Sequence, residues 1–313
     1  MYRLFLGAII FCLSLIAAAS AQAAGIGDLA ADFRQALEQG KASTLAEIDN
    51  DSLLLKRDDR FYTSGMGITR QYALRKDGDA VLFGWRIGQE QYTASDIKLP
   101  PELVVAPDHP YAGWLYAGMF KDTQRRDGSR LKVGVDLGCI GPCAGGEWVQ
   151  RNLHRVINQP QPQGWSRQVR NEFGVVLHAD MAPVRWTPRP YLDVTPNLHA
   201  RFGNIFTDAG AGVTLRAGQF SAQPDMPVTF GFLRIDGRAV GYNATLQGGY
   251  FSHDNPHTVK PKRAVGELEL GLHWSSAQYG ARISLVRRSN EIDGLPNSIG
   301  AQNFVRLQLS YTP

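Results

Sequence analysis

The sequence predicts an all-β protein: a transmembrane antiparallel β-barrel of about 12 strands, with a short helix in an extracellular loop. Two observations carry this prediction. Residues 267–274 and 304–311 alternate apolar with polar residues, which is the pattern of a strand with one apolar face. Very short turns alternate with long polar connections at 92–110, 141–169 and 288–300, as in barrels that cross an outer membrane.

The N-terminus predicts export. Met1-Tyr2-Arg3 is a short basic start, Leu4 to Ala18 is an apolar run, and Ala21-Gln22-Ala23 is a cleavage signal of small residues. The apolar run is shorter than the roughly 20 residues that a spanning helix needs. We therefore predict a signal peptide at 1–23, followed by a mature chain that is periplasmic, secreted or a barrel.

A helix-compatible lead-in at 24–43 follows the signal peptide. In this segment Leu29, Phe33 and Leu37 are four residues apart and would form one apolar stripe on a helix. The hydrophobic period then changes to two, so we place a single barrel domain at 44–313.

Turn signals divide the predicted strands. Asp77-Gly78 and Asp236-Gly237 each lie between alternating runs, and an Asp-Gly pair in that position is a strong hairpin signal. Ser275-Ser276 separates two further runs. We count about 12 to 14 candidate strands. The soluble alternative, a two-sheet sandwich, would rarely need so many long strands or the aromatic residues near strand ends, which are Trp114, Tyr250, Trp274, Tyr279 and Tyr311.

Charge and cysteine content narrow the function classes. Lys and Arg number 33 against 29 Asp and Glu, with a net charge of +4 and no polybasic block, so nucleic acid is not an expected partner. Cys12 lies in the signal peptide. Cys139 and Cys143 remain, and in an oxidising compartment their spacing suits a small disulfide loop.

The connection 141–169 differs from the others because it contains residues at helical spacing between Gly and Pro residues. Gln150 and His154 are four apart and would point from the same face of a short helix. His154 is the natural general base, since an imidazole titrates near neutral pH. Glu172, after this connection, could orient His154 if the loop folds back.

A polar stretch at the start of the barrel is the first functional suspect. Asp49-Asn50-Asp51 and Asp58-Asp59-Arg60 lie where membrane-facing strands begin, and charged groups are costly there unless a site uses them. The oxygens of Asn50 and Asp51 suit a hard cation such as Ca²⁺. The alternative is a turn cluster whose carboxylates bind backbone amides. Asp49 would face the opposite side of the strand.

These motifs and others downstream resemble the outer-membrane lipid A 3′-O-deacylase family. The similarity runs from about Ile48 to the C-terminus in five ordered pieces. The pieces are DND at Asp49–Asp51 with DRFYTSG at Asp59–Gly65, Gly88-Gln89 with Tyr92-Thr93, His109–Tyr116, Gly141-Pro142 with Gln150, His154, Gly164-Trp165, Gln168 and Asn171-Glu172, and Gly203-Asn204 with Gly212, Arg216 and Gly218.

The resemblance implies a twelve-stranded outer-membrane hydrolase that removes the 3′-linked acyloxyacyl group of lipid A. It implies Ca²⁺ held by Asn50 and Asp51, which are active-site residues in that family. Lys98 lies where the family can place an active-site Lys. Ser64 stands where the family has Asn, and Gln150 shares the face of His154. The expected partners are lipopolysaccharide and the bacterial outer membrane, and the expected state is a monomer.

Three alternatives remain open. A transport barrel would line a pore with the inward-facing residues Glu267, Glu269, Arg282, Arg306 and Gln308. An adhesion barrel would bind partners through its long loops. An outer-membrane phospholipase is the nearest rival within hydrolases. A serine acyl-enzyme is not supported, because the sequence shows no Gly-x-Ser-x-Gly elbow.

Overall fold

The protein is a closed β-barrel, as the sequence predicts. The computed structural model describes residues 26–51, 61–76, 78–220 and 227–313. Within these residues, thirteen strands form one antiparallel sheet, which closes because β1 pairs with β13 and β6 pairs with β8. One of them, β7 (Trp186–Arg189), is a four-residue strand beside β8. The wall therefore has the twelve strands that the resemblance implied.

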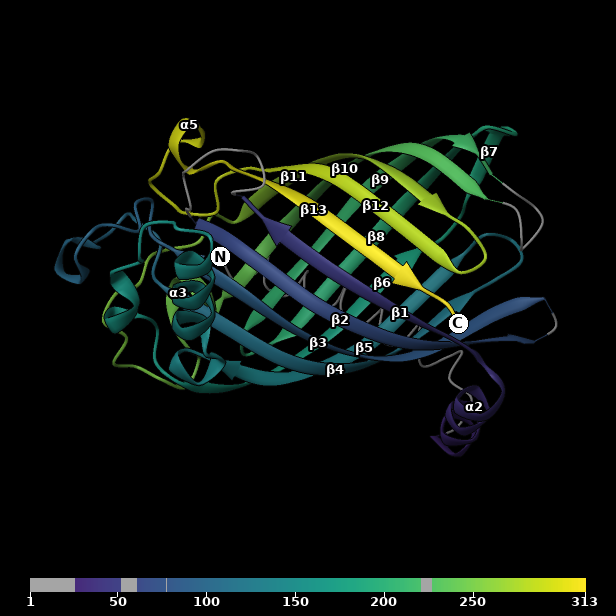
Figure 1. The fold of residues 1–313 in the computed structure, drawn as a ribbon, viewed down its shortest axis with the longest axis horizontal. Coiled ribbons are helices and arrows are strands. Elements are labelled where there is room, and N and C mark those ends of the chain that lie inside the picture. The colour runs from purple at the N-terminus through teal and green to yellow at the C-terminus, as the bar shows by residue number, and fades with distance from the viewer. Residues whose placement is uncertain (1–25, 52–60, 77, 221–226) are drawn as a thin grey trace, which may run out of the picture.

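The wall strands are 10 to 16 residues long, which suffices for strands that cross a bilayer at a slant. Figure 1 shows this slant relative to the long axis of the barrel. The strands are β1 (Lys41–Asn50), β2 (Phe61–Lys76), β3 (Asp79–Thr93), β4 (Ala112–Gln124), β5 (Arg130–Ile140), β6 (Glu172–Ala182), β8 (Leu192–Gly203), β9 (Phe206–Gln219), β10 (Val228–Asn243), β11 (Ala264–Ser275), β12 (Tyr279–Arg288) and β13 (Gln302–Tyr311).

The two ends of the barrel differ in the length of their connections. One end has tight turns, such as the one after Lys76 and the one between Ser275 and Tyr279. The other end carries the long loops, and Figure 1 shows α3 and α5 there. We assign the long-loop end to the cell exterior. The helices of these loops are η2 (Pro101–Leu103), η3 (Pro142–Ala144), α3 (Gly146–Val156), η4 (Gly164–Arg167), α4 (Ala244–Gln247) and α5 (Asn297–Gly300).

The outer surface of the barrel is apolar, as a lipid-facing surface must be. Alternate residues along the strands expose large apolar side chains, for example Ile68 on β2 and Ile283 on β12. Aromatic residues gather at the short-turn end, where Tyr279 and Tyr311 lie with ring centroids 5.4 Å apart. The alternation in the sequence therefore reports the two faces of a membrane barrel, not those of a sandwich.

The inner surface is polar, and its charges are paired. The residues of the pore alternative do face inward, but Arg282 binds Glu269 at 2.8 Å and Gln308 binds Glu47. Arg306 also binds an inward carboxylate, that of Asp49. A carboxylate or guanidinium held by a partner of opposite charge is less available to a passing ion.

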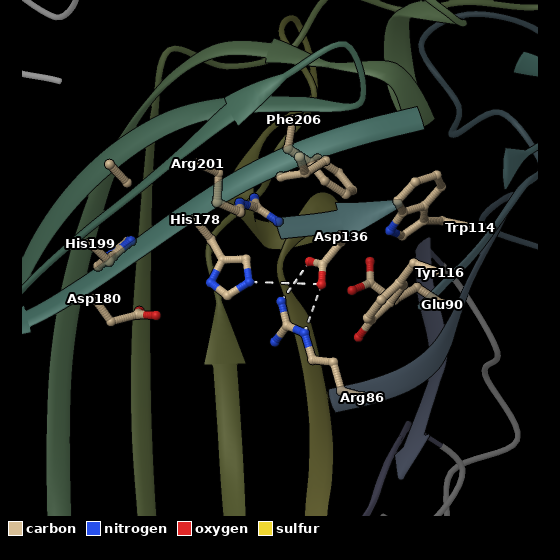
Figure 2. Close-up of a pocket in the computed structure, with 12 residues that line it drawn as sticks. Arg86, Glu90, Trp114, Tyr116, Asp136, His178, Asp180, His199, Arg201 and Phe206 are labelled. Carbon is tan, nitrogen blue, oxygen red and sulfur yellow. Dashed lines mark hydrogen bonds and ion pairs between the residues drawn. The ribbon is translucent and has the colours of Figure 1, made fainter. Parts of the chain in front are cut away.

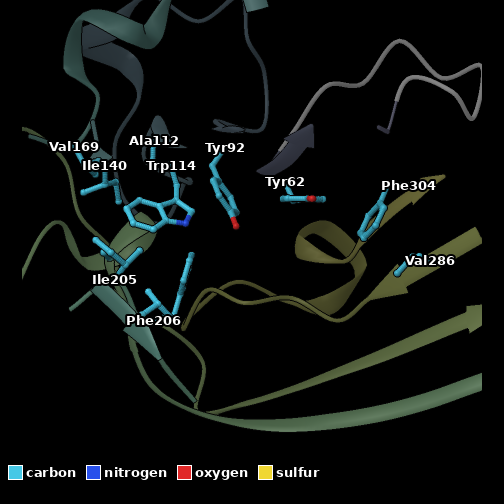
Figure 3. Packing of buried hydrophobic residues seen from close by; sticks show 12 residues of the cluster. Tyr62, Tyr92, Ala112, Trp114, Ile140, Val169, Ile205, Phe206, Val286 and Phe304 are labelled. Carbon is cyan, nitrogen blue, oxygen red and sulfur yellow. The ribbon is translucent and has the colours of Figure 1, made fainter. Parts of the chain in front are cut away.

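An apolar layer crosses the lumen near the extracellular end (Figure 3). Its buried residues form one contact cluster, although they come from strands all around the wall. Tyr62 packs against Tyr92 and Phe304 at centroid distances of 5.4 and 5.0 Å. Bulky apolar side chains therefore lie across the lumen at this level, where a transport pore would be lined by polar groups. Its members are Tyr62, Tyr92, Ala112, Trp114, Ile140, Val169, Val176, Ile205, Phe206, Ala244, Val286 and Phe304.

The predicted hairpin at Asp236-Gly237 is wrong, because β10 runs through both residues. Gly237 is paired with Ala211 on β9 and with Gly266 on β11, so the ladder continues on both sides. The Asp236 carboxylate points into the lumen and accepts a hydrogen bond of 2.9 Å from His199. At the other predicted Asp-Gly turn, Asp77 lies outside the described residues, while β2 ends at Lys76 and β3 begins at Asp79.

The lead-in contains a helix, α2 (Ile26–Gln39), and β1 begins at Lys41, three residues before the predicted start of the barrel. The signal peptide and Cys12 lie outside the described residues. On α2 the predicted stripe is only partly correct. Phe33 packs against Phe83 at 5.6 Å, but Leu37 is exposed and Ala36 is buried instead. Among the described residues, no helix is long and apolar enough to cross a membrane.

The predicted disulfide is present between Cys139, near the end of β5, and Cys143 in η3. The disulfide joins the end of β5 to the short segment that leads into α3.

The first and last strands meet at a buried ion pair. The Asp49 carboxylate on β1 accepts two hydrogen bonds from the Arg306 guanidinium on β13, at 2.8 and 2.7 Å. The Tyr62 hydroxyl donates a third at 3.1 Å. Asp49 therefore faces the lumen, as predicted, while its neighbour Asn50 faces outward. This bidentate pair links the two strands whose pairing closes the barrel.

We expect the Asp49→Ala variant to be less stable by about 3–5 kcal/mol, because Arg306 would stay buried without its carboxylate. The measurement is urea unfolding of the purified protein in detergent, followed by the loss of heat-modifiable mobility on a gel. Asp254→Ala, in an exposed loop, is the matched control and should unfold within about 0.5 kcal/mol of wild type. Equal unfolding midpoints for wild type and Asp49→Ala would show that the pair contributes nothing.

Candidate active site

The outward face of β3 changes character along its length. Trp85 and Ile87 are exposed apolar residues, as the lipid-facing wall requires. The next three outward positions are Gln89, Gln91 and Thr93, and all three are buried. Polar groups on the outer wall of a barrel are costly in contact with lipid. The wall is therefore covered at this place, and the cover identifies the candidate site.

Polar side chains form a row across the first three strands, and the row ends at a glycine on the fourth. In the strand ladders, Asn50 on β1 is paired with Ser64 on β2, and Ser64 is paired with Gln91 on β3. Gln91 is in turn paired with Gly113 on β4. Because neighbouring strands lie roughly 4.8 Å apart, Asn50 and Gln91 are about 10 Å apart along this row. The structure therefore brings Asn50 and Ser64 together on the outer wall.

Helix α3 covers the part of this row that lies on β3 and β4. It contacts β3 and β4 and lies crosswise at the extracellular end of the barrel in Figure 1. The approach is close because both surfaces have glycine there, and a Cβ on Gly113 would lie 3.1 Å from the Ala144 side chain. Gln89 Nε2 donates to the Ala144 carbonyl at 2.6 Å, and Gln91 Nε2 donates to Gln89 Oε1 at 2.7 Å. The predicted loop helix is thus confirmed, and it lies on the lipid-facing side.

Asp51 and the first residues of β2 complete the floor of the site. The Asp51 amide lies 3.5 Å from the Thr63 carbonyl, and the Asp51 side chain is buried. A bulge between Tyr62 and Ser64 shifts the register of β2. The Thr63 hydroxyl lies 2.7 Å from the Thr93 hydroxyl. Asp58, Asp59 and Arg60 lie outside the described residues.

Gln150 and His154 occupy the buried face of α3, as their spacing predicts. The His154 Nδ1–H donates to the Pro160 carbonyl at 2.6 Å. A carbonyl can only accept, so in the neutral ring Nδ1 carries the proton and Nε2 carries the lone pair. Gln150 Oε1 accepts a hydrogen bond of 2.7 Å from the Trp165 indole. The helix therefore presents a base and an amide, both in fixed orientation.

Two other predicted residues are placed differently. Lys98 is exposed in the β3–β4 loop, and its side chain has no hydrogen bond or ion pair with any described residue of the row. The adjacent Ile97 carbonyl accepts from the Gln163 amide at 2.9 Å, so this loop does lie beside the segment that follows α3. A role for Lys98 stays a prediction.

The expectation that Glu172 could orient His154 is wrong. The Glu172 carboxylate accepts hydrogen bonds of 2.8 to 3.0 Å from the amides of Tyr250, Phe251 and Ser252 and from the Asn204 side chain. Three successive backbone N–H groups form a small anion-binding nest. Glu172 thus anchors the β10–β11 loop to the start of β6.

Sequence reasoning missed Thr63, Gln89, Gln91, Thr93 and Trp165 as site residues. A signal for three of them was present. Gln89, Gln91 and Thr93 continue the period-two series of Trp85 and Ile87, and a switch from apolar to polar residues along one face is visible in the sequence. The contact of Trp165 with Gln150 joins residues 15 positions apart in a loop, and no periodicity predicts it.

A cavity of about 220 Å³ lies in the lumen (Figure 2). Its charged groups neutralise one another, since Arg86 binds Asp136 at 2.9 and 2.6 Å and His178 lies 3.8 Å from the same carboxylate. None of the predicted catalytic residues is among the described residues that line it. We therefore assign the cavity to the interior framework. It is lined by Arg86, Glu90, Trp114, Tyr116, Asp136, Val176, His178, Asp180, His199, Ala200, Arg201 and Phe206.

The fold and the site together define a class: a membrane β-barrel whose polar site lies on the outer wall under a helix. The chain belongs to the family of the outer membrane protein LpxR, whose model matches residues 5–312. It is accordingly an outer-membrane protein. No curated protein matches the sequence significantly.

One solved structure supports the fold. LpxR from Salmonella typhimurium superposes with a TM-score of 0.73 and 21% sequence identity, covering 87% of this chain and 100% of that one. The β domain of the Bordetella autotransporter BrkA has a TM-score of 0.46 and 11% identity, covering 86% of this chain and 97% of that one. The first of these likenesses supports the twelve-stranded architecture.

His109, where the resembling family usually has Arg, packs against the apolar layer of the lumen. Its ring is buried and stacks on Tyr92 at 5.4 Å, and its Nδ1–H donates to the Pro110 carbonyl at 2.6 Å. Burial lowers the pKa of His109 below its usual value of 6.5, and this outweighs the opposing effects of the Pro110 carbonyl and of the Glu291 and Asp108 carboxylates. The folded protein therefore keeps the ring neutral.

We expect the β3–β4 loop to loosen in acid. The unfolded loop takes up a proton below about pH 6.5 and the folded loop does not, so the stabilisation is full above that value and is lost as pH falls through the folded pKa. Hydrogen exchange of residues 94–111, corrected for intrinsic rates, should accelerate between pH 7.5 and 5. His109→Phe, which cannot titrate, should remove most of this acceleration. An unchanged pH response in His109→Phe would assign the effect to another group.

Proposed function

We propose that this chain is a lipid A 3′-O-deacylase, an ester hydrolase that removes the 3′-linked acyloxyacyl group of lipid A. One observation supports this most directly. A row of buried polar side chains lies on the wall that faces lipid, and a helix with a base and an amide covers it. A site in this position suits a substrate that stays in the outer leaflet. Membership in the LpxR family is consistent with that substrate.

His154 is the proposed general base. Its Nε2 would take a proton from a water molecule as the water oxygen attacks the ester carbonyl carbon. The Pro160 carbonyl accepts from Nδ1–H in both the neutral and the protonated ring, so the orientation holds throughout. The C–O bond to the 3′ oxygen then breaks, and His154 returns the proton to that oxygen. The products are a free carboxylate and a 3′ hydroxyl.

Calcium is the proposed cofactor, held by Asn50 and Asp51. The residues at hand fit it in chemistry, because the row offers oxygen donors: one buried carboxylate, amide carbonyls and the hydroxyls of Thr63 and Ser64. Among the described residues, no three His, Cys, Asp or Glu side chains form a metal cluster. Neutral oxygens and substrate would therefore have to complete the shell. Bound Ca²⁺ would polarise the ester carbonyl.

The faces of α3 also suit an amphiphile. On one side of the His154 face lie Val149, Leu153 and Val156, and Val156 is 82% exposed. On the other side lie charged residues, among them Arg151, which binds Glu147 at 3.2 Å. An acyl chain and an anionic headgroup could thus lie on opposite sides of the same ester. A phospholipid has a similar division, which keeps the phospholipase alternative within the test.

His154→Asn should abolish the reaction. Loss of a general base typically costs 10²- to 10⁴-fold in rate, so we expect at least about a 100-fold loss. The measurement is mass spectrometry of lipid A from cells that express the chain, where wild type should remove one acyloxyacyl unit. His253→Asn, an exposed loop histidine, is the matched control and should behave as wild type. Unmodified lipid A with folded wild-type barrel would reject the assignment, and release of phospholipid acyl chains instead would favour the phospholipase.

Activity should also depend on calcium. Chelation of Ca²⁺ should stop deacylation by the purified enzyme, and added Ca²⁺ should restore it. Asp51→Asn removes the carboxylate that the described residues offer to the metal, so the Ca²⁺ concentration for half-maximal rate should rise by about tenfold or more. Asp49→Asn, two residues away and facing the lumen, should leave that concentration unchanged. Full activity of wild type in excess chelator would exclude the metal.

A further inference from the structure

The side-chain amide of Gln150 has a defined orientation. An indole N–H can only donate, so the atom of Gln150 that lies 2.7 Å from Trp165 Nε1 is the carbonyl oxygen. The amide nitrogen therefore points the other way. Gln150 is 1% exposed, and its Nε2 is buried without a hydrogen-bond partner among the described residues. Buried donors in native proteins nearly always have an acceptor, so this one calls for an explanation.

Trp165 is held firmly enough to set that orientation. Its side chain is 0% exposed and packs edge-on against Tyr111 at a centroid distance of 5.2 Å. On its other side lies the start of α3, where a Cβ on Gly146 would come within 2.7 Å of the indole ring. The ring is thus confined between the β3–β4 loop region and the helix that carries Gln150. Neither neighbour leaves it room to turn its N–H away.

We propose that Trp165 is a positioning residue, which binds the carbonyl of Gln150 so that the amide N–H₂ of Gln150 is aimed at the carbonyl oxygen of the bound ester. This inference rests on the proposed function. When water adds to the ester carbonyl, negative charge gathers on that oxygen, and the Gln150 N–H stabilises it by a hydrogen bond. Gln150 forms no covalent bond and exchanges no proton. A flipped amide would present its own oxygen and repel the charge.

The geometry explains why an unpaired donor is retained beside His154. Gln150 and His154 are one helical turn apart on the same buried face. A base at one position and a donor at the other can act on the same ester. The water that the base activates attacks the carbonyl carbon, and the oxygen that the donor stabilises is bonded to that carbon. Trp165 itself would not touch the substrate.

The test is the Trp165→Phe variant of the full chain, purified in detergent and assayed on lipopolysaccharide with Ca²⁺. Phenylalanine keeps an aromatic ring but removes the N–H donor together with one ring of the buried indole. We expect kcat to fall roughly tenfold while KM stays within about twofold, since the effect falls on the transition state. Trp148→Phe, the same substitution at an exposed position of α3, is the matched control and should not change kcat. Wild-type kcat in Trp165→Phe would overturn the proposal.

A double-mutant cycle separates positioning from mere packing. Gln150→Ala should lower kcat by about 100-fold, which long incubations can still measure. In that background Trp165→Phe should change kcat by less than about twofold, because no amide remains to be oriented. If Trp165→Phe costs the same factor with and without Gln150, its role is structural and the proposal fails.

A spectroscopic measurement tests the hydrogen bond between Trp165 and Gln150 without relying on the proposed reaction. The indole N–H resonance of Trp165, identified by its loss in Trp165→Phe, should move upfield in Gln150→Ala as the hydrogen bond disappears. A resonance that does not move would contradict the contact. If wild type fails to deacylate lipid A but the resonance shifts, then the proposed function is wrong while the Trp165–Gln150 contact stands.

Discussion

The structure depends on one constraint: a polar side chain on the lipid-facing wall of a barrel must be covered. The row from Asn50 to Gln91 breaks the apolar pattern of that wall, and α3 resolves the conflict by lying over it. The glycines at Gly113 and Gly146 allow this close approach. The loops around α3 hold the helix in this position. The same cover buries polar groups on the wall, and the exclusion of water from such groups would suit the proposed ester hydrolysis.

Most of the fold could be predicted from the sequence. In a membrane barrel, lipid-facing apolar residues alternate with lumen-facing polar residues along each strand, so the sequence has a period of two. The failure at Asp236-Gly237 has a clear physical cause. A turn signal is local, whereas β10 is fixed by ladders to β9 and β11 over its whole length and by a lumen partner for Asp236. The prediction that Leu37 continues the buried apolar stripe of α2 was wrong for a similar reason. Contact with the barrel decides which side of the helix is buried.

The site could be predicted only in part. Helical spacing placed Gln150 and His154 on one face, and the resemblance singled out Asn50, Asp51 and Ser64, of which the ladder pairs Asn50 directly with Ser64. What joins the helix to the strands was not predictable, because it depends on cross-strand register and on loop contacts such as that of Trp165. Glu172 shows the converse: a carboxylate in a family signature serves to anchor a loop.

The closing seam of the barrel has a consequence for its biogenesis. The polar row begins on β1, and β1 is held in place by pairing with β13, which is synthesised after the other described strands of the wall. Until the two ends of the chain meet, Asn50 has no fixed position relative to Gln91 or to α3. Catalytic competence would thus arrive with the final step of assembly. A chain in transit through the periplasm would carry all its reactive groups and yet be unable to attack the lipids it passes.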